Sequence, residues 1–432
     1  MSALDLKTAL AEQEQKLLAC IHCGLCLEAC PTYVITGDEN DGPRGRLYLM
    51  RAVAEGRLPN TSEAFSKHID RCLGCRACEQ VCPAGVEYGQ LLEASRHELL
   101  TAQPKRGLAQ SLLRFGLRSV WTSPRRLRSF FAASRVFRDL GLAKLLFKSG
   151  IVKVISARGH FALALLDSSR DQLNSEPELA KKSVAPKTNR PSEPVMLFGG
   201  CVGEGLFERV NAATRRVLEV NGFEVQTPRT QVCCGALHAH AGDLESARRL
   251  ARQNIQAFGS GEEPIITNAG GCGAMLASYA HLLDTQGAAA FSARVRDVSQ
   301  QLETREALKG APIDERTTYD TSCHLLYGQH AGESSLRMLT SIPNLSFTPL
   351  EGAERCCGGA GIYNLLENEM SARVLREKLT NVQATGAEVL ATGNPGCQMQ
   401  IGAGACLNDI ELKVCHPVEL LDESYDRAGF YE

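Results

Sequence analysis

Between residues 195 and 432, short runs of apolar residues alternate with longer stretches in which apolar residues recur every three or four positions. The short runs predict buried strands, and the three-to-four spacing predicts helices that pack against them. We expect strands over 194–201, 224–226, 264–267 and 388–390, and helices over 204–220, 244–258 and 369–379. Strands that alternate with helices indicate parallel sheets.

The same part of the chain contains an internal repeat marked by cysteines. A single Cys, a Cys-Cys-Gly run and a further Cys occur twice in the same order, at offsets of 122, 123 and 125 residues. A nearly constant offset over three markers predicts a duplication. The first copy has Cys201, Cys233, Cys234 and Cys272, and the second has Cys323, Cys356, Cys357 and Cys397.

Two stretches near the amino terminus carry four cysteines each in the spacing C-x2-C-x2-C-x3-C-P. Thiolate sulfur is the usual protein ligand of iron–sulfur clusters, and this spacing is typical of ferredoxins with two clusters. Three cysteines wrap one cluster from a tight loop, and the fourth, where we expect a helix to start, ligates the other cluster. The expected ligands are Cys20, Cys23, Cys26 and Cys82 for cluster 1, and Cys72, Cys75, Cys78 and Cys30 for cluster 2.

Two [4Fe-4S] clusters are therefore the expected cofactors of residues 1–103. A zinc site or a disulfide framework is the alternative, but two four-cysteine runs are not typical of either. Helices are expected over 47–55 and 86–100. Arg44, Arg46 and Arg76 lie close to the cysteine runs, where they could raise the potential of a cluster or simply form surface salt bridges.

Basic residues gather between residues 104 and 160. This segment has a single acidic residue, Asp139, and its apolar residues recur at helical spacing, so several short amphipathic helices are expected. Such helices are typical of a membrane surface or an acidic partner, and the alternative is a bridge that packs on its own protein. The Lys and Arg residues are Lys105, Arg106, Arg114, Arg118, Arg125, Arg126, Arg128, Arg135, Arg138, Lys144, Lys148, Lys153 and Arg158.

These segments predict an α+β protein with five parts. They are a helical, dicluster ferredoxin-like domain (1–103), a basic amphipathic helical bridge (104–167), a polar, Pro-rich linker (168–194), Cys-Cys-Gly repeat 1 (195–310) and Cys-Cys-Gly repeat 2 (311–432). The strand ends that carry the repeat cysteines should meet at one edge of each sheet, where parallel sheets form their sites. Each set of four could then hold a further cluster, cluster 3 in repeat 1 and cluster 4 in repeat 2; buried structural cysteine is the alternative.

Several classes of protein are disfavoured. The amino terminus lacks a secretory pattern, no apolar stretch is long enough to span a bilayer, and the grouped cysteines suit a reducing, cytoplasmic compartment. Membrane association would be peripheral, and we expect no nucleic-acid partner because the remainder of the chain is acidic. No G-x-G-x-x-G fingerprint follows a strand, so flavin or nicotinamide chemistry would belong to another chain.

The repeats resemble the Cys-Cys-Gly domains of the heterodisulfide reductases. Joined to the two ferredoxin-type runs, they resemble the iron–sulfur subunit of bacterial glycolate oxidase, as do the stretches Gly42–Arg46 and Cys415–Leu421. Related subunits belong to lactate utilisation enzymes and to anaerobic glycerol-3-phosphate dehydrogenase. The resemblance implies an electron-transfer subunit of a 2-hydroxy-acid oxidoreductase, without catalytic residues of its own. Flavoprotein partners with FAD would oxidise glycolate to glyoxylate, and electrons would leave toward a quinone at the inner face of the cytoplasmic membrane.

One departure from the family pattern bears on the chemistry. The full motif ends in C-x2-C, but the first position of that pair is Ala269 in repeat 1 and Asn394 in repeat 2. The heterodisulfide reductase form uses five cysteines for a cluster that cleaves a disulfide, so four per repeat put that activity in doubt. Three alternatives stay open: a lactate or glycerol-3-phosphate dehydrogenase subunit, a thiol/disulfide enzyme, and a metal-binding scaffold without redox turnover.

Overall fold

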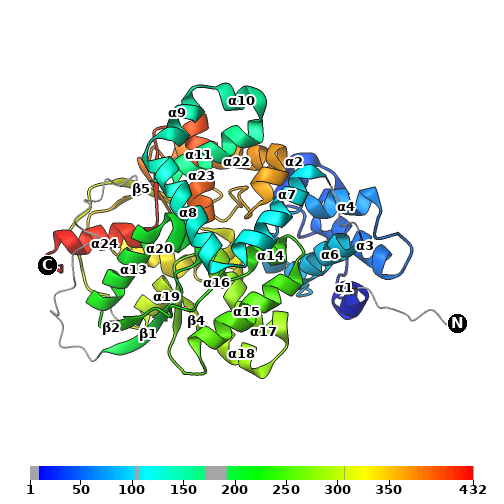
Figure 1. The fold of residues 1–432 in the computed structure, drawn as a ribbon, viewed down its shortest axis with the longest axis horizontal. Helices are drawn as coiled ribbons and strands as arrows, with labels where there is room; N and C mark the ends of the chain where they lie inside the picture. Colours follow the sequence, from blue (N-terminus) through cyan, green and yellow to red (C-terminus); the bar gives the residue numbers. More distant parts are fainter. Residues whose placement is uncertain (1–8, 103–106, 171–191, 306, 432) are drawn as a thin grey trace.

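The computed structural model describes residues 9–102, 107–170, 192–305 and 307–431 and shows a largely helical chain around two small parallel sheets (Figure 1). The α+β class expected from the sequence is confirmed. Most of the linker expected over 168–194 lies outside the described residues. Within the described ranges, no helix combines the length and the apolar composition that a membrane span requires.

The amino-terminal unit is a group of short helices around two cysteine loops. Gly42 caps α3 and Pro43 occupies its first turn, where the missing N–H of proline costs no hydrogen bond. The helix buries Leu47 and Met50 in one core with Phe65 of α4. The elements are η1 (Ala11–Gln13), α1 (Glu14–Leu18), α2 (Pro31–Thr36), η2 (Glu39–Asp41), α3 (Pro43–Ala54), α4 (Glu63–Asp70), α5 (Ala77–Gln80) and α6 (Tyr88–Ala102).

The basic segment forms the series of short helices expected from its sequence. Figure 1 shows these cyan helices lying across the two repeats, with α9 and α10 at one extremity of the molecule. Phe131 of α8 packs on Gly205 of repeat 1 so closely that an added Cβ there would lie 2.4 Å from the ring. The elements are α7 (Leu108–Gly116), η3 (Leu117–Trp121), α8 (Pro124–Asp139), α9 (Leu142–Lys148), α10 (Ile151–Ile155) and α11 (Ala157–Ser168).

Repeat 1 contains a four-stranded parallel sheet in the order β2-β1-β3-β4. Val195 pairs with Val225, and Leu197 pairs with Ile266. The helix expected over 204–220 is two helices, because the chain bends at Phe207, whose ring is buried. The elements are β1 (Glu193–Leu197), α12 (Cys201–Leu206), α13 (Glu208–Val220), β2 (Phe223–Gln226), α14 (Ala236–His240), α15 (Leu244–Phe258), β3 (Ile265–Thr267), α16 (Gly270–Ala277), α17 (Tyr279–Leu283), α18 (Gln286–Ala293), β4 (Val295–Asp297) and α19 (Val298–Glu303).

Repeat 2 has the same strand order, β6-β5-β7-β8, with each strand in the place of its counterpart. Thr318 pairs with Leu390, and Ala391 pairs with Cys415 on the fourth strand. The equivalent topology confirms the duplication expected from the cysteine offsets. The elements are β5 (Arg316–Asp320), η5 (His324–Gly328), α20 (Gly332–Thr340), β6 (Ser346–Phe347), α21 (Tyr363–Leu366), α22 (Asn368–Ala384), β7 (Val389–Thr392), α23 (Pro395–Leu407), β8 (Lys413–Cys415) and α24 (Pro417–Arg427).

A buried ion pair joins the two repeats. Arg216 on α13 donates two hydrogen bonds to Asp422 on α24, from Nε at 3.0 Å and from its terminal nitrogen at 2.6 Å. Tyr431 donates a third to the same carboxylate at 2.7 Å. Both charged side chains are at most 8 % exposed. Water therefore cannot stabilise the two charges, and their stabilisation depends on the hydrogen bonds between them.

We expect Asp422→Ala to lower the free energy of unfolding by about 3 to 5 kcal/mol, because it leaves the Arg216 guanidinium buried without a counter-charge. Urea unfolding followed by circular dichroism measures the change. Glu388→Ala is the matched control, since Glu388 pairs with Arg316 at the surface and such pairs contribute about 1 kcal/mol or less. Equal losses in the two variants would contradict a structural role for the buried pair.

Candidate metal centres

Both amino-terminal cysteine loops turn by the same backbone device. In the first loop His22 and Gly24 have positive φ angles of 55° and 88°. In the second loop Gly74 and Arg76, at the equivalent positions, have φ angles of 65° and 64°. Left-handed residues at alternate positions curl the chain and turn consecutive N–H groups toward one side, which is how backbone loops cradle anionic groups.

The eight ferredoxin-type cysteines line two adjacent cavities. Cys20, Cys23, Cys26 and Cys82 border one cavity together with Leu47, Pro83 and Val86. Cys30, Cys72, Cys75 and Cys78 border the second. The sequence assigned the ligands in the same crossed sets, with the fourth cysteine of each run in the other run's set. Cys78 also borders the first cavity, so the two cavities share a wall.

The chain after the fourth cysteine differs between the two runs. Cys30 is the N-cap of α2, with Pro31 in its first turn, as expected from the sequence. After Cys82 no helix begins: the chain makes a turn closed by a hydrogen bond from Gly85 to the Cys82 carbonyl, and α6 starts only at Tyr88. The expectation of a helix start was therefore wrong for the second run. Gly85 has a φ of 63°, which is incompatible with a helix beginning at Pro83.

The thiols of the second cavity suit a metal centre. Burial raises the pKa of Cys75 well above its usual value, and the negative charge of Cys356 raises it further. Burial likewise raises the pKa of Cys78, with Cys75 adding to the effect. Thiolates this close together need a compensating cation, and a metal centre supplies it while displacing the thiol protons. Four thiols can bind either zinc or a [4Fe-4S] cluster, and the ferredoxin-type spacing of these cysteines favours the cluster.

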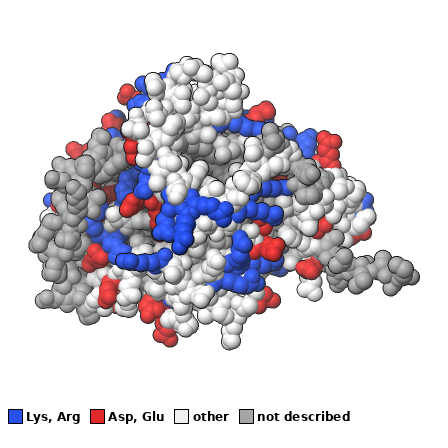
Figure 2. Space-filling model, viewed as in Figure 1, with Lys and Arg blue, Asp and Glu red and all other residues white. Residues whose placement is uncertain are grey.

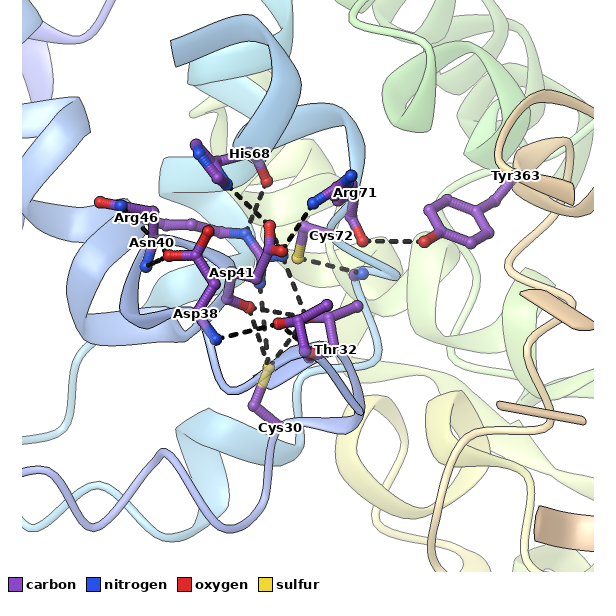
Figure 3. Close-up of polar contacts among 12 residues, drawn as sticks. Cys30, Thr32, Asp38, Asn40, Asp41, Arg46, His68, Arg71, Cys72 and Tyr363 are labelled. Atoms are coloured by element: carbon purple, nitrogen blue, oxygen red, sulfur yellow. Dashed lines mark hydrogen bonds and ion pairs between the residues drawn. The ribbon is translucent and has the colours of Figure 1, made fainter. Parts of the chain in front are cut away.

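A buried network of charges lies behind Cys30 (Figure 3). The Arg46 side chain is 1 % exposed, donates to the His68 carbonyl at 2.7 Å and to Thr32 Oγ1 at 3.0 Å, and places a terminal nitrogen 3.8 Å from Cys30 Sγ. Asp41 is its counter-charge, at 3.8 Å. Because Arg46 has no route to water, its positive charge acts directly on the second cavity.

Asp41 is itself held by two further partners. Burial would raise its pKa, but hydrogen bonds from His68 at 2.8 Å and from Arg71 at 2.9 Å outweigh that effect and lower the pKa. Asp41 therefore stays ionised and keeps Arg46 in place. Although Asp38, Asp41 and His68 lie close enough to suggest a cation site, the arginines already neutralise Asp41.

Other donors surround the cluster thiols. Tyr88 points its hydroxyl at Cys72 Sγ at 3.6 Å, and the Gly74 N–H lies 3.4 Å from the same sulfur. The Val86 N–H lies 3.5 Å from Cys82 Sγ. Hydrogen bonds to cluster sulfur favour the reduced state, so these groups bear on the potential. Thr32, Asp41 and Tyr88 were not predicted, because no motif in the sequence marks them. Arg44, Arg46 and Arg76 were expected near the cysteine runs, and all three line the cavities.

In repeat 1 the four thiols lie around the point where the strand order reverses. Cys201 follows β1 and Cys272 follows β3, and parallel sheets form their sites between such strands. Cys234 Sγ lies 3.5 Å from Cys272 Sγ, a distance far too long for a disulfide. A hydrogen bond with Cys233 and burial both raise the pKa of Cys201.

Repeat 2 gathers its four thiols in the same way. Cys357 Sγ lies 3.3 Å from Cys397 Sγ, and all four cysteines of the set are buried. A hydrogen bond with Cys357 and burial raise the pKa of Cys397 well above its usual value. Gly358 has a φ of 85° and approaches the Ser371 carbonyl, so the residue after the Cys-Cys pair must be glycine for the chain to turn there.

The position of the absent fifth cysteine is occupied differently in the two repeats. In repeat 2, Asn394 directs its amide nitrogen at Cys397 Sγ, 3.4 Å away, while its oxygen accepts from the Gly271 N–H of repeat 1 at 3.2 Å. In repeat 1, Ala269 offers no polar atom. The side chain that replaces the thiol in repeat 2 is therefore a hydrogen-bond donor that also links the two repeats.

The second cavity and the thiols of repeat 2 are direct neighbours. Cys75 packs in one apolar cluster with Cys323 and Cys356, beside Leu73 and Tyr363. Tyr363 also donates a hydrogen bond to the Arg71 carbonyl at 2.9 Å, which fixes repeat 2 against the amino-terminal unit. The thiols of repeat 1 border a different core.

The histidines beside the repeat cysteines hold the units together. His238 bonds the Leu117 carbonyl of the bridge at 3.2 Å, and His324 bonds the Gly74 carbonyl of the second cluster loop at 3.2 Å. His240 stacks on His324 with 5.5 Å between ring centroids. The hydrogen bonds of His238 and His324 thus go to backbone carbonyls of neighbouring units and not to the cysteine sulfurs.

Comparisons with known proteins agree with this layout. A model of the 4Fe-4S dicluster domain matches residues 16–86, and a model of the Cys-rich domain matches 195–277 and 317–402. The probable glycolate oxidase iron–sulfur subunit of Bacillus subtilis is 36 % identical over 427 residues, which are 96 % of this chain and 95 % of that protein. The glycolate oxidase iron–sulfur subunit of Escherichia coli is 30 % identical over 428 residues, 96 % of each chain.

A shorter relative matches only part of the chain. Lactate utilization protein A of Bacillus licheniformis is 31 % identical over 235 residues, which are 53 % of this chain and 98 % of that protein. The two glycolate oxidase subunits, in contrast, are matched over nearly their whole length. With two ferredoxin-type cavities, two Cys-rich repeats and full-length relatives of this kind, the chain belongs to the family of glycolate oxidase iron–sulfur subunits.

Proposed function

We propose that this chain is the electron-transfer subunit of a complex that oxidises glycolate to glyoxylate. Flavoprotein partners with FAD would carry out the oxidation, and the electrons would pass through this chain toward a quinone at the inner face of the cytoplasmic membrane. A [4Fe-4S] cluster, when bound, exchanges single electrons, whereas oxidation of an α-hydroxy acid removes a hydride, so a flavin on another chain must connect the two.

One observation carries the proposal: thiol sets suited to redox centres lie side by side along the molecule. The two ferredoxin-type cavities share Cys78, and Cys75 of the second cavity packs beside Cys356 of repeat 2. Repeat 2 in turn touches repeat 1 through Asn394 and Gly271. Electron transfer requires neighbouring centres to be close, whereas a metal-binding scaffold would not need its thiol sets to be in contact. A row of adjacent thiol sets therefore favours electron transfer.

We assign Cys20, Cys23, Cys26 and Cys82 as ligands of cluster 1, and Cys72, Cys75, Cys78 and Cys30 as ligands of cluster 2. The crossed composition of the two cavities supports this assignment. The four thiols of each repeat are proposed to hold a further cluster; their mutual contacts without disulfide geometry support it.

The alternatives differ in their support. The lactate utilisation relative covers about half of this chain, so a lactate complex is the weaker alternative, and the flavoprotein partner would decide between the substrates. A thiol/disulfide enzyme is disfavoured by Ala269 and by Asn394, whose amide already occupies the place of the fifth thiol.

The proposal predicts the composition of the native complex. Purified without oxygen, this chain should bring along flavoprotein partners, and glycolate should bleach the iron–sulfur absorbance of the complex. Iron analysis should give about 12 to 16 irons per chain, since each of three or four clusters contributes four, against about 8 for the ferredoxin-type clusters alone. A complex without flavin would overturn the hydroxy-acid oxidase proposal.

The crossed ligation predicts which cluster each cysteine serves. Cys30→Ser should remove or distort the electron paramagnetic resonance signal of cluster 2 and spare cluster 1, although Cys30 belongs to the first run. Cys82→Ser should do the reverse. Cys406→Ser is the control, because Cys406 is exposed and lies outside the four sets. Loss of cluster 1 in Cys30→Ser would refute the crossed assignment.

Arg46 should set the potential of cluster 2. Replacing it by Met removes a buried positive charge near Cys30, so the midpoint potential should fall by on the order of 100 mV in a redox titration followed by electron paramagnetic resonance. Arg46→Lys keeps the positive charge, so it should shift the midpoint potential less than Arg46→Met. The Lys variant can also be measured if the Met variant binds its clusters poorly. Arg51→Met, on the same helix but paired with Glu55 at the surface, should leave it unchanged. An unshifted potential in both Arg46 variants would show that Arg46 is only structural.

A further inference from the structure

The end of the bridge exposes an unusual number of aliphatic side chains. We call residues 140–155, which contain α9 and α10, the α9–α10 tip. α10 has no buried residue, and Ala143 is the one buried residue of α9. The exposed fractions are 69 % for Leu140, 65 % for Leu145, 60 % for Ile151, 90 % for Val154 and 78 % for Ile155. A contiguous apolar surface of this kind marks an interaction site.

The tip is held firmly and projects from the molecule. Gly141 and Gly150, with φ angles of 77° and 68°, turn the chain sharply into α9 and α10. Both helices pack on α11, which packs in turn on α23 of repeat 2. Figure 1 shows α9 and α10 at the extremity of the molecule, and in Figure 2 the surface over them is mostly uncharged, while basic side chains cross the face below.

The charged residues of the tip indicate what kind of partner binds there. Lys144, Lys148 and Lys153 lie within the tip, and no Asp or Glu occurs between residues 140 and 166. Aliphatic residues flanked by lysines suit the headgroup region of an anionic bilayer, where the side chains enter the acyl boundary and the ammonium groups meet lipid phosphates. A protein partner would favour the opposite composition, because interface cores are enriched in aromatic residues and depleted of Lys.

We propose that the α9–α10 tip inserts into the surface of an anionic lipid bilayer and holds the chain there. With α9 and α10 only 7 and 5 residues long, the tip would lie in the interface rather than cross it. This inference rests on the proposed delivery of electrons to a membrane, since it names the surface that makes the contact. Lipid binding needs no redox step, so its test stands apart from that of the glycolate reaction.

The test is co-flotation of the full-length, cluster-loaded chain with vesicles. The wild-type chain should float with vesicles of phosphatidylglycerol and phosphatidylethanolamine, and bind phosphatidylcholine vesicles far less. Replacing Ile151, Val154 and Ile155 together by Ser should weaken the binding at least about tenfold, and Lys144→Glu with Lys148→Glu should weaken it comparably. All five side chains belong to the tip and none belongs to a thiol set, so iron content should match the wild type.

A matched control and a depth measurement complete the test. Leu112→Ser with Phe115→Ser changes two exposed apolar residues of α7 and should leave vesicle binding unchanged. Trp121 is the only native tryptophan, so Val154→Trp adds emission that brominated lipids should quench on binding. The proposal is overturned if the wild-type chain binds no vesicle, or if the Ser variant of the tip binds vesicles as well as the wild type. It is also overturned if the Ser variant keeps its lipid binding but loses a protein that copurifies with the wild type.

Discussion

Sixteen thiol groups are held in four close sets without disulfides, and the rest of the structure depends on how the charges of their thiolates are compensated. A buried thiolate is costly, and several together are costlier, so each set requires a cation. The loops accommodate this requirement with left-handed residues, such as Gly74 and Gly358, that bring backbone close to sulfur. The short helices of the amino-terminal unit frame these loops, and its stability should therefore depend on the bound metal.

The amino-terminal unit and the two repeats are also held in fixed positions relative to one another by contacts at the thiol sets. The loop that surrounds the second cavity is bonded by His324 and packed by Tyr363, both from repeat 2. The loop that follows β3 in repeat 1 is in turn bonded by Gly393 and Asn394. The thiol sets of the second cavity and of the two repeats thus border a neighbouring unit, and the bridge closes the assembly by covering both repeats. Electron transfer needs this proximity, and the same contacts also provide much of the stability.

Much of this could be predicted from the sequence, because cysteine spacing is a local signal. The crossed sets and the duplication followed from it, while the pattern of apolar residues predicted β1, β2, β3, β7 and several helices, with α15 at its observed bounds. The strands β4, β5, β6 and β8 were not predicted, because β4, β6 and β8 have only two or three residues and none of the four is a run of apolar residues. The network of Asp41, Arg46 and His68 was also out of reach: nothing local distinguishes Arg46, which is buried, from Arg44, which pairs with Glu39 at the surface.

The two repeats differ in the buried charges that lie near their thiols. Under the thiols of repeat 2 lies a buried pair, Lys378 with Asp320, at 2.8 Å and at most 2 % exposed, and the charges of Cys356 and Cys357 act on Lys378. At the repeat offset of 122 residues, the position of Asp320 is taken in repeat 1 by Phe198, and residues 253–256, which lie 122 to 125 positions before Lys378, carry no charge. Because a buried ammonium and a buried carboxylate both act on the thiols of repeat 2, and repeat 1 has no such pair at the corresponding positions, the two sets should differ in potential even with the same ligands. The set that adjoins the second ferredoxin-type cavity is the one with the buried ion pair, so the two repeats are not equivalent members of the row of centres, as identical copies would be.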